Sequence, residues 1–162
     1  MVLADRAANR MNQTYICDTP EATFTLGERL GGEIRGGEVL LLRGGLGAGK
    51  TLLTKGILEA LGFDIDEVTS PSFSLVNLYK TESLDVYHID LWRIDDGSNS
   101  SFAVGLDEIL DDPNAVVIIE WAERLGPRNF PSRVISVEIV GDGDEPRRIT
   151  IEWSERKSAN VV

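Results

Sequence analysis

Residues 44–51 read Gly44-Gly45-Leu46-Gly47-Ala48-Gly49-Lys50-Thr51 and match the G-x-x-x-x-G-K-T pattern in full. An apolar run, residues 39–42, precedes this stretch, and a sequence compatible with a helix follows it from Thr51 to Leu61. In that setting the glycines allow the backbone to turn so that its N–H groups point inward at phosphate oxygens. The helix that starts here also directs its positive dipole at the anion. The stretch therefore predicts a strand, a phosphate-binding loop and a helix.

The end of the loop carries the residues that contact a triphosphate most directly. Lys50 supplies a mobile positive charge for the β- and γ-phosphates, and the hydroxyl of Thr51 can ligate Mg²⁺. We predict that the chain binds a nucleoside triphosphate through every residue of the loop. These residues are Gly44, Gly45, Leu46, Gly47, Ala48, Gly49, Lys50 and Thr51.

Length and composition narrow the class of protein. The chain has 162 residues, 42% hydrophobic and 27% charged, which fits one globular domain with a core of its own. A single cysteine excludes a disulfide framework within the chain, and no apolar run approaches the roughly 20 residues of a membrane-spanning helix. The net charge of −11 repels phosphate backbones and argues against independent binding of DNA or RNA. We therefore expect a cytoplasmic protein that binds neither membranes nor DNA.

The first helix is expected to begin with Thr19 as the N-cap and Pro20 at the first helical position. An apolar stripe then recurs every four residues, at Ala22, Leu26 and Leu30, and Gly27 and Gly31 leave a flat neighbouring face. The glycine pair at residues 36–37 is expected to end this element. The helix after the loop is expected to bury Leu53, Ile57 and Leu61 and to end at Gly62.

Alternating residues predict two antiparallel hairpins, and a continuous apolar run predicts a strand that is buried on both faces. The hairpins pair Phe73–Tyr79 with Leu84–Ile89 and Arg133–Val140 with Arg147–Trp153; the buried strand is Ala115–Ile119, and a short helix covers Asp107–Leu110. The fold class is thus α/β, a single P-loop NTPase-like domain with a central mixed parallel and antiparallel sheet flanked by helices. We divide the chain into an N-terminal extension that can hold a first strand (1–18), the domain (19–153) and a polar tail (154–162).

Phosphoryl transfer needs a second acid beside the metal and a group that positions the attacking nucleophile. Such an acid usually ends an apolar strand, and two residues fit this description. Glu120 follows the run Ala115–Ile119, and Asp90 follows the shorter run Val86–Ile89. An acid at a strand end is often merely exposed at the rim of a sheet, but two of them in a chain with a phosphate-binding loop favour a shared site.

Three local sequences occur in a characteristic order and spacing. They are Gly47-Ala48-Gly49-Lys50-Thr51, Ser70-Pro71-Ser72-Phe73-Ser74-Leu75-Val76, and His88-Ile89-Asp90-Leu91-Trp92-Arg93 with Ile119-Glu120-Trp121. Together they resemble the TsaE (formerly YjeE) family of small bacterial ATPases. The resemblance covers roughly residues 19–153. It implies ATP or ADP as the nucleotide and Mg²⁺ as the metal, in a protein required for the threonylcarbamoyl modification of adenosine in tRNA.

The resemblance also implies a role for individual residues. Lys50 and Thr51 match the phosphate-binding lysine and the magnesium-ligating threonine, and Glu120 matches the acid that completes the Mg²⁺ site. Asp90 matches an aspartate needed for hydrolysis, so the implied catalytic residues are Asp90 and Lys50 and the implied metal ligands are Thr51 and Glu120. This chain departs from the family pattern at Trp92, where tyrosine is usual.

The resemblance implies partners as well. These are TsaD- and TsaB-type subunits of a complex that transfers the threonylcarbamoyl group, with tRNA reached only indirectly. Hydrolysis is then expected to be slow without those subunits. Pockets for the base are poorly encoded in sequence, and position alone points to Thr19 and the region of Arg147.

The phosphate-binding loop is also compatible with three other functions. A small-molecule kinase shares the loop but needs an arginine-bearing lid, for which Arg124, Arg128 and Arg133 are the candidates. A GTP switch protein is weakened because the chain lacks an Asn-Lys-x-Asp motif. A module that binds nucleotide without hydrolysing it is the remaining alternative.

Overall fold

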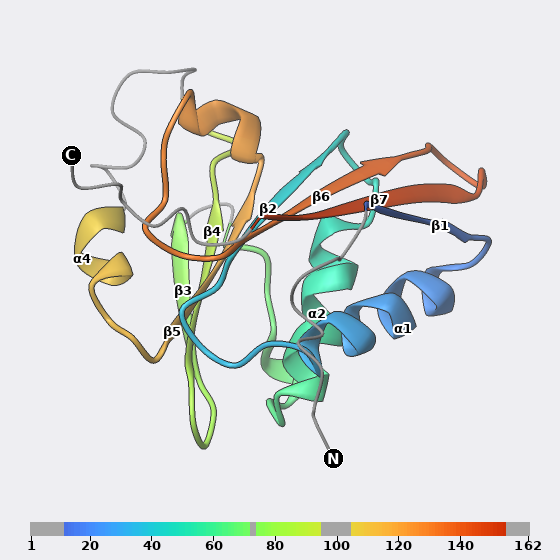
Figure 1. The fold of residues 1–162 in the computed structure, drawn as a ribbon. Helices are drawn as coiled ribbons and strands as arrows, with labels where there is room; N and C mark the ends of the chain where they lie inside the picture. Colours follow the sequence, from blue (N-terminus) through green and yellow to red (C-terminus); the bar gives the residue numbers. More distant parts are fainter. Residues whose placement is uncertain (1–11, 72–73, 95–104, 155–162) are drawn as a thin grey trace, which may run out of the picture.

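One mixed sheet organises the computed structural model, which describes residues 12–71, 74–94 and 105–154. The strands of this part of the chain are β1 (Gln13–Cys17), β2 (Val39–Gly44), β3 (Val76–Lys80), β4 (Asp85–Asp90), β5 (Ala115–Glu120), β6 (Val134–Val140) and β7 (Arg147–Ser154). Their order is β1-β7-β6-β2-β5-β4-β3 (Figure 1). The neighbours β6-β2, β2-β5 and β5-β4 are parallel, and the remaining pairs are antiparallel. The predicted mixed α/β sheet is confirmed.

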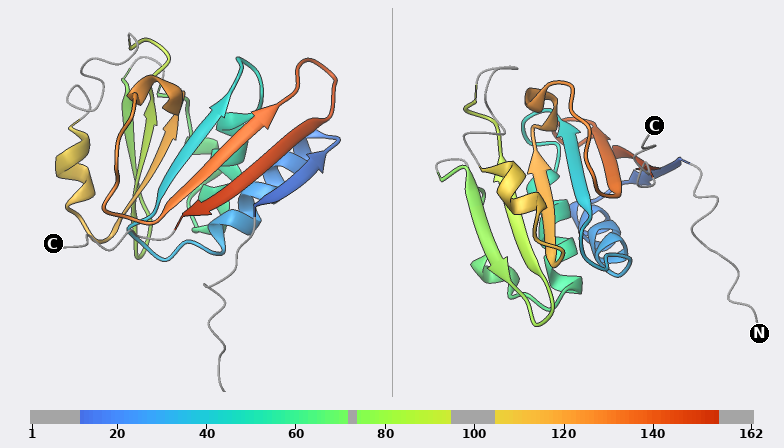
Figure 2. Two further views of the ribbon diagram at one scale, coloured as in Figure 1. Left: turned by 45° about the horizontal axis from the view of Figure 1, so that its top comes forward. Right: turned by 60° about the vertical axis from the view of Figure 1, so that its left-hand side comes forward.

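Helices pack on both faces of this sheet. They are α1 (Pro20–Gly31), α2 (Lys50–Ala60), α4 (Leu106–Leu110) and the 3₁₀ helices η1 (Ile65–Glu67) and η2 (Ala122–Leu125). Leu26 of α1 and Leu53 of α2 belong to one hydrophobic cluster, whereas Leu106 of α4 and Ala122 of η2 belong to another. Figure 2 shows α2 and α4 on opposite sides of β5. Strand β5 is therefore covered on both sides, and all six of its residues are buried.

Helix α1 begins as expected, because the Thr19 hydroxyl oxygen accepts a hydrogen bond from the Ala22 N–H at 3.1 Å. Its predicted end is wrong: the helix stops at Gly31 and does not reach residues 36–37. The carboxylate of Glu38 accepts hydrogen bonds from the N–H groups of Arg35 and Gly36, at 2.9 and 2.8 Å. The helix itself closes earlier, with bonds from the N–H of Glu33 to the Leu30 carbonyl and from the N–H of Ile34 to the Gly31 carbonyl, and the Glu38 bonds fix the turn that follows.

The predicted flat face of α1 is the contact with α2. A Cβ atom added at Gly27 would lie 2.3 Å from the carbonyl oxygen of Leu53, and one added at Gly56 would lie 2.1 Å from that of Phe24. The backbones of the two helices thus approach too closely for any side chain at these positions. This approach holds α2, and with it the preceding loop, against the rest of the domain.

We expect Gly56→Ala to lower the free energy of unfolding by about 2–3 kcal/mol, because the added methyl group overpacks this contact. Gly32→Ala is a matched control, since Gly32 has ordinary helical backbone angles and its Cβ would meet nothing closer than 3.5 Å. Urea unfolding of both variants measures the difference. Equal stability of the two variants would contradict the close approach of the helices.

Both predicted hairpins are present, as β3-β4 and β6-β7. Strand β3 nevertheless begins only at Val76, because Leu75 has a left-handed backbone angle (φ 67°) that a strand does not accommodate. The strand allowed for in the N-terminal extension is β1, which pairs with β7 and so belongs to the same sheet. The start of that extension (1–11), Ser72 and Phe73, and tail residues 155–162 lie outside the described residues.

Candidate nucleotide-binding site

The strand order brings the loop and both predicted acids to one edge of the sheet. The loop leaves the end of β2, whose neighbour β5 ends at Glu120, and the next strand β4 ends at Asp90. Glu120 is paired in register with Leu42 on one side and with Asp90 on the other. The carboxyl ends of parallel strands are where open α/β sheets bind ligands. The two acids predicted from separate strands are therefore direct neighbours.

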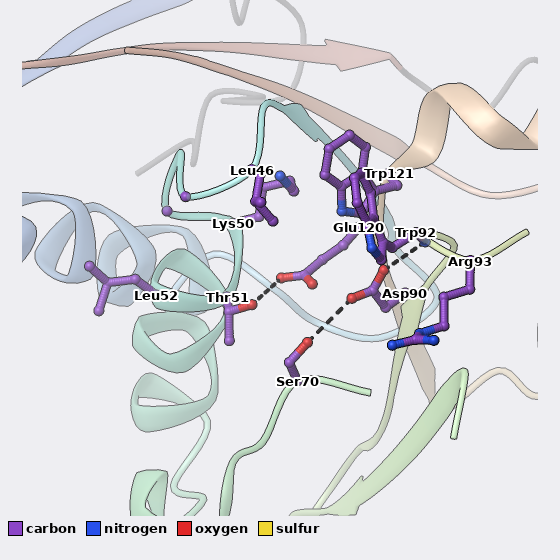
Figure 3. A pocket seen from close by; sticks show the side chains of 12 residues that line it. Leu46, Lys50, Thr51, Leu52, Ser70, Asp90, Trp92, Arg93, Glu120 and Trp121 are labelled. Atoms are coloured by element: carbon purple, nitrogen blue, oxygen red, sulfur yellow. Dashed lines mark hydrogen bonds between the residues drawn. The ribbon is translucent and has the colours of Figure 1, made fainter. Parts of the chain in front are cut away.

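Alternation along the strands decides which way these acids face. His88 and Asp90 share a face of β4 with Val86, which belongs to the hydrophobic cluster under α1 and α2. Glu120 shares a face of β5 with Ile118 of the same cluster. Both carboxylates consequently face the N-terminus of α2, where Lys50 and Thr51 begin the helix (Figure 3).

The loop depends on its glycines for this approach. Gly47 and Gly49 have left-handed backbone angles, φ 76° and 112°, which residues with a side chain rarely adopt. Gly49 is the N-cap of α2, and no side chain caps this helix. Its first turn therefore has N–H groups available for an anion, as a phosphate-binding loop requires. Gly45 has open space around it, so the absence of a side chain there costs no packing.

Lys50 is buried beneath an aromatic ring. Its Nζ donates hydrogen bonds to the carbonyl oxygens of Gly44 and Gly45, at 2.7 and 2.8 Å, and lies 4.2 Å from the ring centroid of Trp121. Burial lowers the pKa of Lys50 below its ordinary value, and the carboxylates of Glu120 and other nearby acids oppose this shift. The ammonium is thus partly desolvated and lies within the loop that it is predicted to serve.

Thr51 and Glu120, the two predicted metal ligands, are in direct contact. The Thr51 hydroxyl donates a 2.8 Å hydrogen bond to Oε1 of Glu120, whose side chain is 2% exposed. Burial alone would raise the pKa of Glu120, but His88, the Thr51 hydroxyl and Lys50 together hold this pKa below its ordinary value. The carboxylate is therefore charged at neutral pH, as a cation ligand must be.

Asp90 is fixed by two groups outside its own strand. Its Oδ1 accepts a 2.8 Å hydrogen bond from the Trp92 N–H, and its Oδ2 accepts a 3.3 Å bond from the Ser70 hydroxyl. Figure 3 shows Ser70, Asp90, Glu120 and Thr51 facing one another across the same space. Asp90 as a whole is 4% exposed, and the two bonds hold its carboxylate facing the loop.

These residues line a cavity of about 430 Å³ whose other wall is aromatic. The ring centroids of Trp92 and Trp121 are 4.4 Å apart, and the Arg124 guanidinium carbon lies 5.4 Å from the first centroid and 5.7 Å from the second. Trp121 has a left-handed backbone angle (φ 57°), so the chain turns immediately after Glu120. Trp92, the departure from the family pattern, thus keeps an aromatic contact with Trp121.

A second cavity, of about 310 Å³, lies on the other side of the loop. Thr19 and Arg147, the two positions suggested for the base, line this cavity together with Cys17, Gly49 and Leu52. Gly49 lines both cavities, so a ligand that crosses the loop could occupy the two together. Thr19 and Arg147, which were suggested from their positions in the sequence, thus lie beside the loop in the structure.

The donor set suits Mg²⁺ bound together with a nucleotide. The available ligands are hard oxygens, the Thr51 hydroxyl and the carboxylates of Glu120 and Asp90, and Mg²⁺ usually takes one or two carboxylates and completes its shell with phosphates and water. Among the described residues, no group of three or more His, Cys, Asp or Glu side chains could hold a metal by itself. The side chains of Thr51, Glu120 and Asp90 could therefore supply some of the ligands of a Mg²⁺ ion, and the phosphates of a bound nucleotide would supply others.

Of the three arginines considered for a kinase lid, only Arg124 lies beside the cavity, over the rings of Trp92 and Trp121. Arg124 donates a 2.9 Å hydrogen bond to the carbonyl oxygen of Ile94, and Arg128 pairs with Asp107. Arg133 pairs at 2.7 Å with Glu38, which precedes the first residue of β2 and so lies at the far edge of the sheet from the loop. The three arginines therefore do not form the cluster that a kinase lid needs.

Sequence reasoning left the role of one buried group open, His88, the only histidine of the chain. His88 is fully buried, neither ring nitrogen has a hydrogen-bond partner within residues 12–71, 74–94 and 105–154, and its Nε2 lies 3.6 Å from Oε1 of Glu120. A histidine within a strand reads equally well as a core residue. Its position two residues before Asp90, and hence on the same strand face, was the available signal.

The sheet, the loop and the acids at its edge define an α/β domain of the P-loop class. Residues 17–150 match the family model described as threonylcarbamoyl adenosine biosynthesis protein TsaE. The chain therefore belongs to the TsaE family.

Individual relatives agree with this assignment. The tRNA threonylcarbamoyladenosine biosynthesis proteins TsaE of Bacillus subtilis and Mycobacterium bovis are 36% and 38% identical to this chain. Their alignments cover 81% and 85% of this chain and 79% and 84% of the relatives. The crystal structure of YdiB from Bacillus subtilis superposes with a TM-score of 0.67 at 31% identity, over 88% of this chain and 87% of YdiB. A separate observation concerns membranes: none of the helices in the described part of the chain combines the length and the hydropathy of a membrane-spanning segment.

Proposed function

We propose that this protein is a Mg²⁺-dependent ATPase that acts in the threonylcarbamoyl modification of adenosine in tRNA. The observation that carries the proposal is the 2.8 Å hydrogen bond between Thr51 at the end of the loop and Glu120, with Asp90 paired beside Glu120. A loop that merely connected a strand to a helix would not need two buried acids facing its hydroxyl. Buried carboxylates are costly unless they serve a partner, and a hydrated cation with a triphosphate is such a partner.

The roles of the side chains follow from their positions. The loop amides and Lys50 bind the phosphates and stabilise the charge that develops on them during transfer. Asp90, held by Ser70 and Trp92, orients a water molecule for attack on the γ-phosphorus, whose bond to the bridging oxygen breaks to release ADP and inorganic phosphate. Thr51 and Glu120 would hold Mg²⁺, which neutralises phosphate charge when bound.

The biological role rests on the family. Relatives that are 36% and 38% identical to this chain over the aligned residues carry the name tRNA threonylcarbamoyladenosine biosynthesis protein. We infer that the chain works with TsaD- and TsaB-type subunits and reaches tRNA through them, because a net charge of −11 disfavours direct binding of a polyanion. ATP turnover would then drive a conformational step of that complex.

The experiment compares release of inorganic phosphate from ATP by the protein alone and with TsaD- and TsaB-type subunits. We expect slow release alone and faster release with the subunits. Transfer of labelled γ-phosphate to a metabolite would indicate a kinase instead, and a preference for GTP would indicate a switch protein. Binding without turnover under both conditions would leave only a nucleotide-binding module.

We place the nucleoside in the second cavity, which predicts that ATP protects Cys17. This residue is the only cysteine of the chain, is 5% exposed, and lines that cavity. Burial raises the pKa of its thiol, so at pH 8 we expect the folded protein to react with a disulfide reagent at least about tenfold more slowly than the unfolded chain. Added ATP should slow the reaction of the folded protein further. The same rate with and without saturating ATP would contradict this placement of the nucleoside.

A further inference from the structure

Arg147, at the start of β7, directs its guanidinium at four backbone carbonyls. Its Nε donates to the oxygen of Ala48 at 3.1 Å, and its Nη2 donates to that of Gly47 at 3.3 Å. The same Nη2 donates to Gly143 at 2.9 Å, and Nη1 donates to Glu145. Two acceptors belong to the phosphate-binding loop and two to the turn between β6 and β7. One side chain thus joins segments about a hundred residues apart.

These bonds bear on the loop because a peptide group is planar and trans. The carbonyl of Gly47 and the N–H of Ala48 share one plane and point in opposite directions, and the carbonyl of Ala48 is related in the same way to the N–H of Gly49. Fixing both carbonyls toward Arg147 therefore fixes the orientation of both peptide groups: the Ala48 N–H donates to the Gly45 carbonyl at 3.2 Å within the loop, and the Gly49 N–H points away from Arg147. Loop amides are the groups that hold phosphate oxygens in a loop of this kind.

Arg147 also adds positive charge behind the loop. No carboxylate in the described part of the chain forms an ion pair with it, since its bonds go to carbonyl oxygens. A guanidinium keeps its charge at any pH that the protein tolerates. The turn is closely packed around this side chain, because a Cβ added at Gly141 would lie 2.9 Å from Cδ of Arg147.

We propose that Arg147 is a positioning residue that holds the loop in its phosphate-binding form, so that nucleotide affinity depends on the β6-β7 turn. This inference rests on the proposed ATP site. Because the fixed amides serve the phosphates common to both nucleotides, ATP and ADP should be affected alike. An amine in place of the guanidinium can reach fewer of the four carbonyls, so lysine should substitute only in part.

The test measures dissociation constants for ATP and ADP through the intrinsic tryptophan fluorescence, since two of the three tryptophans, Trp92 and Trp121, line the cavity at the loop. For Arg147→Ala we expect both constants to rise about 10- to 100-fold, and for Arg147→Lys we expect an intermediate rise. Arg148→Ala is the matched control, because Arg148 is the next residue of β7 and is exposed. Its affinity should equal that of the unmodified protein.

Two further measurements distinguish a positioning role of Arg147 from a general contribution to the stability of the fold. The melting temperatures of Arg147→Ala and Arg148→Ala without nucleotide should agree within a few degrees, and methylguanidinium should restore part of the lost affinity of Arg147→Ala. Two outcomes would overturn the proposal. One is an ATP affinity of Arg147→Ala within twofold of that of the unmodified protein. The other is a loss of ATP affinity that is accompanied by a lower melting temperature and is not restored by methylguanidinium. Failure of the unmodified protein to bind ATP would instead refute the proposed function.

Discussion

Lys50→Ala is expected to reduce ATP hydrolysis by about 10²- to 10³-fold, since removal of a single preorganised charge at a transferring phosphoryl group has effects of that size. Lys50 is the side chain that the loop itself surrounds, with its ammonium bonded to the carbonyl oxygens of Gly44 and Gly45. ATP affinity should fall as well, because the charge acts on the bound ground state. Phosphate release under saturating Mg²⁺ and ATP, with the subunits present, measures the effect.

Lys55→Ala controls for loss of a positive charge on the same helix. Lys55 lies within α2 but does not line the cavity at the loop. Its rate of phosphate release should stay within about twofold of the unmodified protein, as is usual for a substitution away from a site. If Lys50→Ala and Lys55→Ala hydrolyse ATP equally well, the loop is not the site of phosphoryl transfer.

Asp90→Asn is expected to separate binding from turnover. The amide has the size of the carboxylate and can still accept the hydrogen bond from the Trp92 N–H, so the site should keep its shape. It cannot act as a base or orient water as a carboxylate does, and we expect kcat to fall about 10²- to 10³-fold. The dissociation constant for ATP should change by less than about threefold, since Asp90 is not assigned to the phosphates.

Asp85→Asn is the matched control, because Asp85 begins β4 and Asp90 ends it. The two residues thus lie at opposite edges of the same sheet, and only Asp90 lies beside the loop. We expect Asp85→Asn to hydrolyse ATP at the normal rate. A normal kcat in Asp90→Asn, or equal losses in both variants, would remove Asp90 from the mechanism.

Local sequence was enough to predict the elements whose signals are strong and short. The loop and the strand and helix beside it follow from glycine spacing and an apolar run, and the N-cap at Thr19 follows from a hydroxyl before Pro20. The end of α1 was predicted too late because the sequence holds two glycine pairs, at residues 31–32 and 36–37, and the helix ends at the first of them. Glycine is a common helix terminator at both places, so the pattern alone does not choose between them.

The site could be predicted in its parts but not in its arrangement. Glu120 and Asp90 were found because each ends an apolar run, yet their adjacency depends on the order of β2, β5 and β4. The bonds of Arg147 to the loop come from a strand that follows it by about a hundred residues. Contacts of this kind depend on topology, which periodicity does not reveal.

The proposed site is tested most directly by a crystal structure of the protein with a non-hydrolysable ATP analogue and Mn²⁺ in place of Mg²⁺. We expect an anomalous Mn²⁺ signal beside the Thr51 hydroxyl and the Glu120 carboxylate, with the γ-phosphate between Lys50 and Asp90. A triphosphate bound elsewhere on the protein, or a metal signal remote from Thr51 and Glu120, would contradict the proposed site.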